Sequence, residues 1–138
     1  PGRQREVNAL VLDASAAVEI LAETSRGDAL LSEAATRRNW WVPDHFHLEV
    51  ASGFRRLRLN GFINDERASK ALNELAVLPL LVSQTLGMLP QAWQYRSNLT
   101  MQDALYVSLA QYLEIPLLTS DARLANAPNL PVEIIYIG

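Results

Sequence analysis

Four carboxylates lie far apart in the chain, yet each sits inside or beside an apolar segment: Asp13, Glu49, Asp103 and Asp121. An unpaired carboxylate is costly to bury, so four in such places suggest that a cation compensates them. Carboxylate oxygens suit Mg²⁺ or Mn²⁺, and two such ions about 4 Å apart can activate a water and stabilise the leaving oxygen of a phosphodiester. The residues therefore predict metal-dependent phosphodiester hydrolysis.

Asp13 directly follows a short, mostly apolar run, residues 7–12, and Asp121 follows a second such run, residues 116–119, after Ser120. Runs of this length are typical of buried strands. If the two strands are parallel neighbours, both carboxylates emerge at the carboxyl edge of the sheet, where open α/β sheets bind ligands. Asp is also a favoured N-cap, and a helical pattern follows each residue, so capping remains an alternative for both.

Glu49 falls in a predicted helix over residues 44–60, with Asp44 as a good N-cap and Gly61 as the C-cap. The apolar positions of this helix recur at helical spacing, and Glu49 lies on or beside their stripe, which comprises Phe46, Val50, Gly53 and Leu57. We expect its side chain to point inward. The alternative is a boundary Glu that pairs with Arg55 or Arg56.

Asp103 stands three residues after Thr100, an arrangement close to a capping box. A structural role at the helix start is therefore a serious alternative. However, the predicted helix over residues 100–114 is apolar almost all round, which indicates that it is nearly buried. Its first turn is then expected near the same edge of the sheet as Asp13.

The remaining elements are predicted from hydrophobic periodicity and breaker residues. The expected strands cover residues 7–12, 40–42, 78–82, 116–119 and 132–137, and the expected helices cover residues 13–22, 26–38, 44–60, 64–76, 87–97 and 100–114, with a short one from Asp121. Apolar strands separated by helices predict a three-layer α/β/α sandwich around a mostly parallel sheet. We expect one domain over residues 6–138. Because the chain begins with Pro1, residues 1–5 are expected to be a processed or flexible end.

Composition excludes several other classes of protein. The chain has no cysteine, which removes disulfides, thiolate zinc sites and cysteine nucleophiles. A net charge of −3 argues against broad attraction to nucleic acid, so a polyanion must be held locally. No apolar run is long enough to cross a membrane, and we expect a soluble, cytoplasmic protein without a membrane partner.

A cluster of arginines and a pair of histidines lie close to Glu49 in the sequence. Arg55, Arg56 and Arg58 form the only basic cluster near a predicted ligand and could hold RNA phosphates, although a solvated helix face explains them equally well. His45 and His47 with Glu49 suggest zinc, but residues two apart on a helix do not share a face, and the H-E-x-x-H pattern is absent.

The ordered set of motifs resembles the PIN-domain nucleases, and most closely the VapC-type toxins of bacterial toxin–antitoxin pairs. The stretches that carry the resemblance are VLDASAAVEIL at 11–21, TMQDALYVSLA at 100–110 and IPLLTSDARL at 115–124. The last two look like the family's D-A-x-Y-x-x-L-A and P-L-L-T-x-D patterns. No single motif is specific, whereas their order over residues 7–137 is.

The resemblance implies a PIN-like fold and an endoribonuclease that cuts structured RNA such as tRNA or rRNA. It implies that Asp13, Glu49, Asp103 and Asp121 are catalytic ligands of Mg²⁺ or Mn²⁺. Supporting roles are implied for Ser15, Thr119 and Ser120. It further implies a homodimer and inhibition by a cognate VapB-type antitoxin. The competing hypothesis is a non-catalytic PIN-fold module for interaction or dimerisation, in which the acidic residues serve as helix caps.

Overall fold

A five-stranded sheet forms the centre of the computed structural model, which describes residues 8–138. Its strands are β1 (Ala9–Leu12), β2 (Asn39–Pro43), β3 (Leu81–Ser83), β4 (Leu117–Thr119) and β5 (Ile134–Tyr136). They are arranged in the order β3-β2-β1-β4-β5, and every pairing is parallel. The predicted parallel sheet is confirmed. The expectations for residues 1–5 and for Val7 lie outside the described residues.

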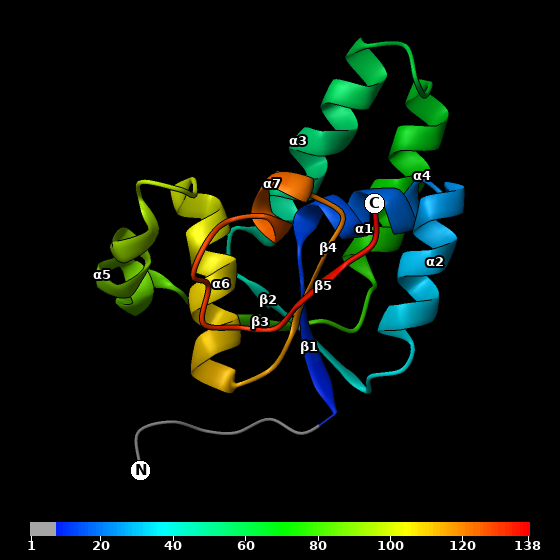
Figure 1. The fold of residues 1–138 in the computed structure, drawn as a ribbon. Helices are drawn as coiled ribbons and strands as arrows, with labels where there is room; N and C mark the ends of the chain where they lie inside the picture. Colours follow the sequence, from blue (N-terminus) through cyan, green and yellow to red (C-terminus); the bar gives the residue numbers. More distant parts are fainter. Residues whose placement is uncertain (1–7) are drawn as a thin grey trace.

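Helices cover both faces of this sheet. They are α1 (Ala14–Leu21), α2 (Ser25–Ala34), α3 (Phe46–Leu59), α4 (Asp65–Ala76), α5 (Leu89–Ala92), α6 (Met101–Leu113) and α7 (Ala122–Ala125), with 3₁₀ turns η1 (Leu86–Met88) and η2 (Trp93–Tyr95) beside α5. In Figure 1, α5 and α6 lie on one side of the sheet, and α1, α2 and α4 lie on the other. The three-layer sandwich predicted from the sequence is therefore confirmed.

The two central strands, β1 and β4, are the most buried part of the sheet. All four residues of β1 and all three of β4 are buried, which explains why both runs are continuously apolar up to the last residue of β4. By contrast, the first two residues of the edge strand β3 are exposed. Burial of β1 and β4 fixes the position of every residue that follows them.

The sheet reverses its direction of growth between β1 and β4. The chain leaves β1 through α1 and α2 to reach β2, whereas it leaves β4 through α7 to reach β5 on the opposite side. Right-handed crossovers in opposite directions must lie on opposite faces, so the two connections diverge at the carboxyl ends of β1 and β4. Such a topological switch point is where α/β sheets bind ligands.

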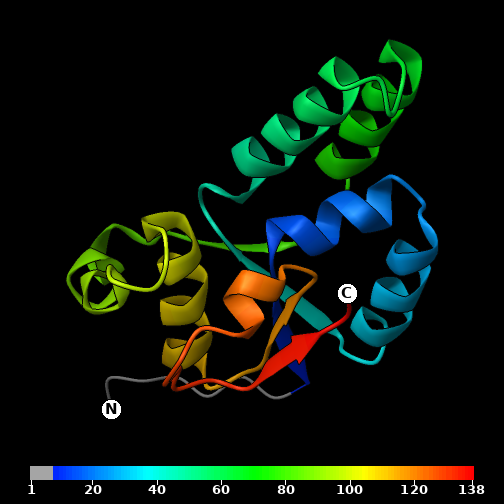
Figure 2. The ribbon, with the colours of Figure 1, turned by 45° about the horizontal axis from the view of Figure 1, so that its top comes forward.

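Helices α3 and α4 form a hairpin that extends away from the rest of the molecule (Figure 2). Helix α3 packs on α1 and α4, while α6 packs directly against β1, β2 and β4. The hairpin base is therefore attached to the body chiefly through α1.

Two predicted elements differ from the structure, and proline explains both. The strand predicted over residues 78–82 begins at Leu81, because the last turn of α4 takes up Val77 and Leu78 and because Pro79 offers no N–H to the sheet. The helix predicted over residues 87–97 is instead η1, α5 and η2 in succession. Pro90 fits only the first turn of a helix, so a continuous helix through it is excluded.

The start of α3 also differs from the prediction. The helix begins at Phe46, with His45 rather than Asp44 at the N-cap position. The Asp44 carboxylate instead accepts a hydrogen bond of 2.7 Å from the Thr85 hydroxyl, which ties the end of β2 to the segment after β3. A long-range donor has replaced the local capping interaction.

We expect Gly27→Ala to destabilise the fold, because α1 and α2 pack closely at this glycine. A Cβ at Gly27 would lie 2.0 Å from the backbone oxygen of Glu19, so α2 would have to shift. The expected loss is about 1–3 kcal/mol in the free energy of unfolding, measured by urea denaturation. Gly87→Ala is the matched control, because a Cβ there meets no atom within 4 Å. Equal stabilities for the two variants would contradict this account of the α1–α2 contact.

Candidate active site

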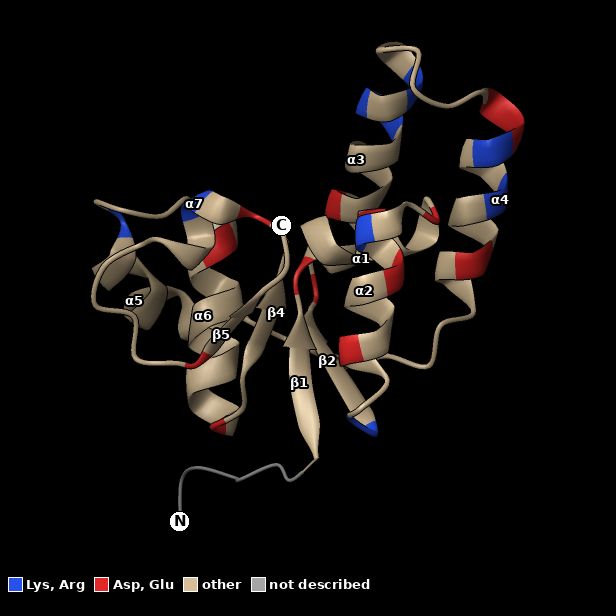
Figure 3. Cartoon of the chain, turned by 45° about the vertical axis from the view of Figure 1, so that its right-hand side comes forward, with Lys and Arg blue, Asp and Glu red and all other residues tan. Residues whose placement is uncertain are grey.

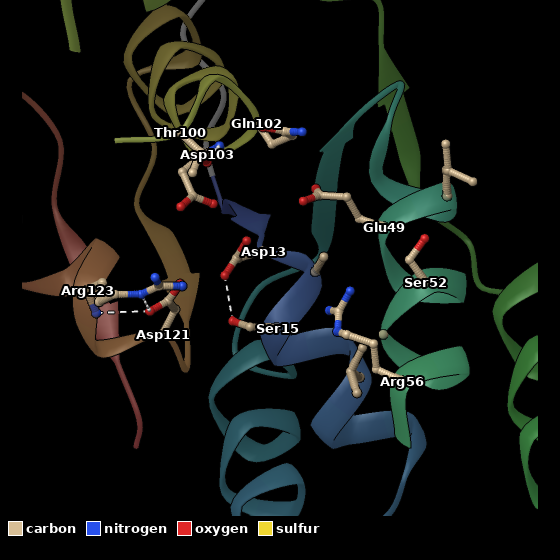
Figure 4. A pocket seen from close by; sticks show the side chains of 14 residues that line it. Asp13, Ser15, Glu49, Ser52, Arg56, Thr100, Gln102, Asp103, Asp121 and Arg123 are labelled. Carbon is tan, nitrogen blue, oxygen red and sulfur yellow. Dashed lines mark hydrogen bonds and ion pairs between the residues drawn. The ribbon is translucent and has the colours of Figure 1, made fainter. Parts of the chain in front are cut away.

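The four acidic residues line one pocket of about 520 Å³ at the switch point. They arrive from four separate elements: Asp13 from the end of β1, Glu49 from the first turn of α3, Asp103 from the first turn of α6, and Asp121 from the loop after β4. In the close view their side chains surround a common space (Figure 4). The structure thus brings together all four predicted site residues.

Asp13 is held by two hydroxyl groups. Only 4% of the residue is exposed, and its Oδ2 accepts hydrogen bonds from Ser15 Oγ at 2.5 Å and from Thr119 Oγ1 at 2.7 Å. Although Asp13 occupies the N-cap position of α1, its side chain makes no capping hydrogen bond. Capping is therefore the wrong explanation for the Asp13 side chain. Ser15 and Thr119 both donate to Oδ2, and neither donates to Oδ1.

Burial raises the pKa of Asp13 to about 6, although the hydrogen bonds from Ser15 and Thr119 lower it. The negative charges of Asp103 and Glu49 add smaller contributions that raise it. A carboxylate in this position is favoured in its charged form by any cation that enters the pocket.

Asp121 and Asp103 combine structural and site positions. Asp121 does cap α7, because its Oδ1 accepts a hydrogen bond of 2.9 Å from the Arg123 N–H. At Asp103, the backbone N–H donates to Thr100 Oγ1 at 3.1 Å, and Thr100 is the N-cap of α6. Burial raises the pKa of Asp103, and the charge of Asp121 raises it further. For Asp121, capping and a place in the pocket are thus compatible, whereas at α6 the capping side chain is that of Thr100, and Asp103 supplies the backbone N–H.

Glu49 points into the pocket from the opposite wall, as its helical position predicted. Its side chain is 31% exposed, and Tyr106 Oη donates a hydrogen bond of 2.8 Å to its Oε1. His45 Nε2 lies 3.1 Å from the same oxygen. Among the described residues, Glu49 makes no ion pair with Arg55 or Arg56, so the pairing alternative finds no support.

The predicted supporting residues divide by how they contribute. Thr119 Oγ1 donates to Asp13 and accepts the Asp121 N–H at 3.0 Å, so it links two of the carboxylates. Ser120 acts through its backbone N–H, which donates to Ser15 Oγ at 3.3 Å, and its side chain does not line the pocket. Both residues hold Asp13, Ser15 and Asp121 in one network.

Of the three arginines predicted to contact RNA, Arg56 alone lines the pocket. Arg58 forms an ion pair with Asp65 at the other end of the hairpin, and all three arginines are exposed. Figure 3 shows basic segments on α3 and on α7, with acidic segments between them. The basic segment on α7 is Arg123, which lines the pocket opposite Arg56 and is 91% exposed at its side chain.

Sequence reasoning gave no role to Arg123 or Tyr106. Tyr106 could have been found from its spacing, because a residue three after Asp103 shares its helix face. A tyrosine in an apolar helix also needs a partner for its hydroxyl when it is buried. Arg123 carries no such signal, since an exposed arginine after a strand is common on any surface.

The donor set fits a hard divalent cation. One oxygen each of Asp13, Glu49 and Asp121 is taken by donors of the protein, which leaves the second oxygen of each for a ligand. In residues 8–138, no three acidic or histidine side chains lie close enough to form a ready-made ion site. The carboxylates line the pocket rather than converging on one point, an arrangement that suits Mg²⁺ because this ion keeps several of its waters.

Comparison with known proteins identifies relatives over most of the chain. Residues 10–130 match the PIN domain family. Ribonuclease VapC1 of Mycobacterium tuberculosis is 39% identical over 128 residues, which cover 90% of this chain and 94% of that protein. Ribonuclease VapC3 of the same species is 37% identical over 118 residues and covers 86% of each chain.

Solved structures of low sequence identity share the fold. The crystal structure of Mycobacterium tuberculosis VapC20, described as a sarcin-ricin loop cleaving toxin, superposes with a TM-score of 0.63 at 16% identity and covers 90% of this chain and 98% of its own. VapBC2 from Rickettsia felis, bound to a DNA fragment from its promoter, gives a TM-score of 0.62 at 14% identity, with 94% and 99% coverage.

The buried charge at Asp13 predicts a pH-dependent stability. The pKa of Asp13 is about 6 in the folded chain against an ordinary value of 3.8, so the folded state holds a proton that the unfolded state releases. The resulting stabilisation is fully present below pH 3.8 and is lost as the pH rises through 6, a loss of about 3 kcal/mol. Asp13→Asn stays neutral, and its amide oxygen can still accept both hydroxyl hydrogen bonds.

We therefore expect the stability of Asp13→Asn relative to wild type to increase between pH 4 and pH 7. Urea unfolding with a chelator present measures this difference. Asp28→Asn, an exposed position on α2, is the control, and its difference from wild type should stay nearly constant. A constant difference for Asp13→Asn as well would contradict the assignment of a raised pKa.

Proposed function

The chain belongs to the PIN-domain family and, within it, to the VapC ribonucleases, and from this we propose that it is a Mg²⁺- or Mn²⁺-dependent endoribonuclease toxin. Its substrate in this proposal is structured RNA such as tRNA or rRNA. The observation that carries the proposal is the meeting of Asp13, Glu49, Asp103 and Asp121 in one pocket. Four carboxylates in one pocket repel one another, and a bound cation would compensate this repulsion.

Two features of the pocket support hydrolysis of a phosphodiester. Asp13, Glu49, Asp103 and Asp121 are the residues that would hold the ion, each offering a hard oxygen. The chemistry that such an ion supplies is stabilisation of charge on a phosphate and activation of water. Ser15 and Thr119 fix Asp13 in one orientation, so its position does not need to change when a substrate arrives.

Arg56 and Arg123 flank the acidic centre from α3 and α7 and are suited to bind phosphates of the RNA strand (Figure 4). Their placement supports a substrate that crosses the pocket between the two helices. Guanidinium groups bind phosphate oxygens in pairs, which compensates for the net charge of −3 on the whole chain. Arg55 and Arg58 lie outside the pocket and would contact RNA only beyond the cleavage site.

The proposed partners are a VapB-type antitoxin and a second copy of the chain. The structural similarity to VapBC2, a VapBC complex, supports the first partner. Exposed apolar side chains support the second, because a soluble monomer rarely gathers so many: those around β3 and η1 are Leu81, Val82, Leu86 and Leu89. No helix within residues 8–138 is both long enough and apolar enough to cross a membrane. We propose a cytoplasmic location, where the RNA substrates are.

The alternative function is a PIN-fold module that binds partners without catalysis. The capping role of Asp121 favours it in part, because that carboxylate has a structural purpose. Asp13 argues against it, since a buried carboxylate that caps nothing destabilises the fold without a cation.

We expect purified protein, freed of antitoxin, to cleave total RNA with Mg²⁺ or Mn²⁺ and to stop when a chelator is added. Asp103→Asn should reduce the rate by about 100-fold or more, because it removes a charged ligand without changing size. Asp28→Asn should cleave at the wild-type rate. Absence of metal-dependent cleavage by the wild type would favour the binding module.

Metal binding should also appear as a gain in stability. At 100 times its dissociation constant, Mn²⁺ should stabilise the folded protein by about 2.7 kcal/mol, because it binds only the folded state. Differential scanning fluorimetry measures the increase in Tm, with Mn²⁺ and with chelator. An unchanged Tm at millimolar Mn²⁺ would show that the carboxylates do not act together as ligands.

A further inference from the structure

Glu49 differs from the other three carboxylates in the element that carries it. Asp13 and Asp121 follow the central strands, and Asp103 begins a helix that packs directly on the sheet. Glu49 lies on α3, at the base of the hairpin that extends from the molecule (Figure 2). Its distance from the other carboxylates therefore depends on whatever connects α3 to the body of the protein.

The hydroxyl of Tyr106 makes such a connection. Tyr106 lies on α6 and is completely buried, and its Oη donates to Glu49 Oε1 at 2.8 Å across 57 residues of sequence. Burial raises the pKa of this hydroxyl most strongly, and the backbone N–H of Ala14, the residue after Asp13, lowers it. One buried group on α6 thus binds α3 and lies near the start of α1.

Packing alone does not account for a tyrosine here. A phenylalanine would fill the same space among the apolar neighbours of α6, whereas a buried hydroxyl is costly unless it has hydrogen-bond partners. In Tyr106 that partner is Glu49. The hydrogen bond to Glu49 therefore explains why this position carries a tyrosine rather than a phenylalanine.

His45 reinforces the same contact. Its Nε2 lies 3.1 Å from Glu49 Oε1, and its ring meets the ring of Tyr106 edge-on, with centroids 5.2 Å apart. His45 and His47 are two residues apart and do not share a helix face, whereas His45 and Glu49 are four residues apart and do. Tyr106 Oη donates to Oε1, and His45 Nε2 lies close to the same oxygen without forming a hydrogen bond, which leaves Oε2 for a ligand in the pocket.

We infer that Tyr106, assisted by His45, is a positioning residue for Glu49: it holds one carboxylate oxygen so that the other stays in the pocket with Asp13, Asp103 and Asp121. The inference rests on the proposed function, because Glu49 needs this position only if it serves a cation site. It assigns no catalytic contact to Tyr106, which acts through Glu49 alone.

The test is the Mn²⁺ affinity of Tyr106→Phe, measured by titration calorimetry on the full chain without RNA. We expect the dissociation constant to increase by about 10- to 100-fold, the usual effect of losing a partner that orients a ligand. Tyr95→Phe is the matched control, because its hydroxyl also donates to a side chain on α6, Gln111, at 3.2 Å but lies away from the pocket. Its dissociation constant should stay within about twofold of wild type.

A double-mutant cycle separates positioning from general damage to the fold. If Tyr106 acts through Glu49, the Tyr106→Phe change should have no further effect on Mn²⁺ affinity in a Glu49→Ala background. An equal loss in both backgrounds would overturn the inference. If Tyr106→Phe does not fold, His45→Phe serves in its place, because it removes the Nε2 contact and keeps a ring against Tyr106. Wild-type affinity in that variant would then overturn the inference.

RNA cleavage distinguishes the two ways of failing. If the wild type binds Mn²⁺ and cleaves RNA while Tyr106→Phe matches it in both assays, the positioning role is wrong and the proposed function stands. If the wild type itself neither binds Mn²⁺ nor cleaves RNA, the proposed function is wrong, and the positioning role is wrong with it.

Discussion

The carboxylate of Asp13 is buried at the carboxyl end of β1. Burial of this charge is unfavourable, and the groups around it compensate for the lost hydration. Hydroxyls of Ser15 and Thr119 hold one of its oxygens, and Thr119 reaches it because β4 pairs directly with β1. The strand pairing in the centre of the sheet thus determines how the Asp13 carboxylate is oriented. Because the same β4 leads into Asp121, a single pairing places two carboxylates.

The central strands β1 and β4 were predicted correctly, because their local sequence determines them. The two central strands are apolar up to the last residue of β4, with Asp13 directly after β1 and Asp121 two residues after β4, so their burial and their common edge could be inferred from pattern alone. For each Asp, however, the sequence left capping open, and the structure divides the two cases. Asp121 caps its helix, whereas the Asp13 side chain does not. The Asp13 carboxylate is instead held by Ser15 and by Thr119, and Thr119 is 106 residues away in sequence and could not be identified as its donor by local rules.

Long-range partners also explain what prediction missed. Asp44 looked like a helix cap, yet Thr85 captures its carboxylate. Tyr106 looked like one more apolar position of a buried helix, yet its hydroxyl connects two helices that are far apart in sequence. The region after β3 was misjudged for a local reason instead, since Pro90 divides what periodicity presented as one helix. Patterns of hydrophobicity describe which face is buried, but they do not show which distant polar group will meet it.

The position of β4 in the sheet has a consequence for how the protein is made. It lies beside β1 at the centre, yet the ribosome synthesises it after β1, β2 and β3. Until it is inserted, Asp13 lacks the Thr119 hydroxyl, and Asp121 and Arg123, which follow β4 and line the pocket, have no fixed place. A nascent chain therefore cannot assemble the site from its first hundred or so residues. For a protein whose activity would damage the cell's own RNA, a site completed by a late central strand delays activity until nearly the whole domain has been synthesised.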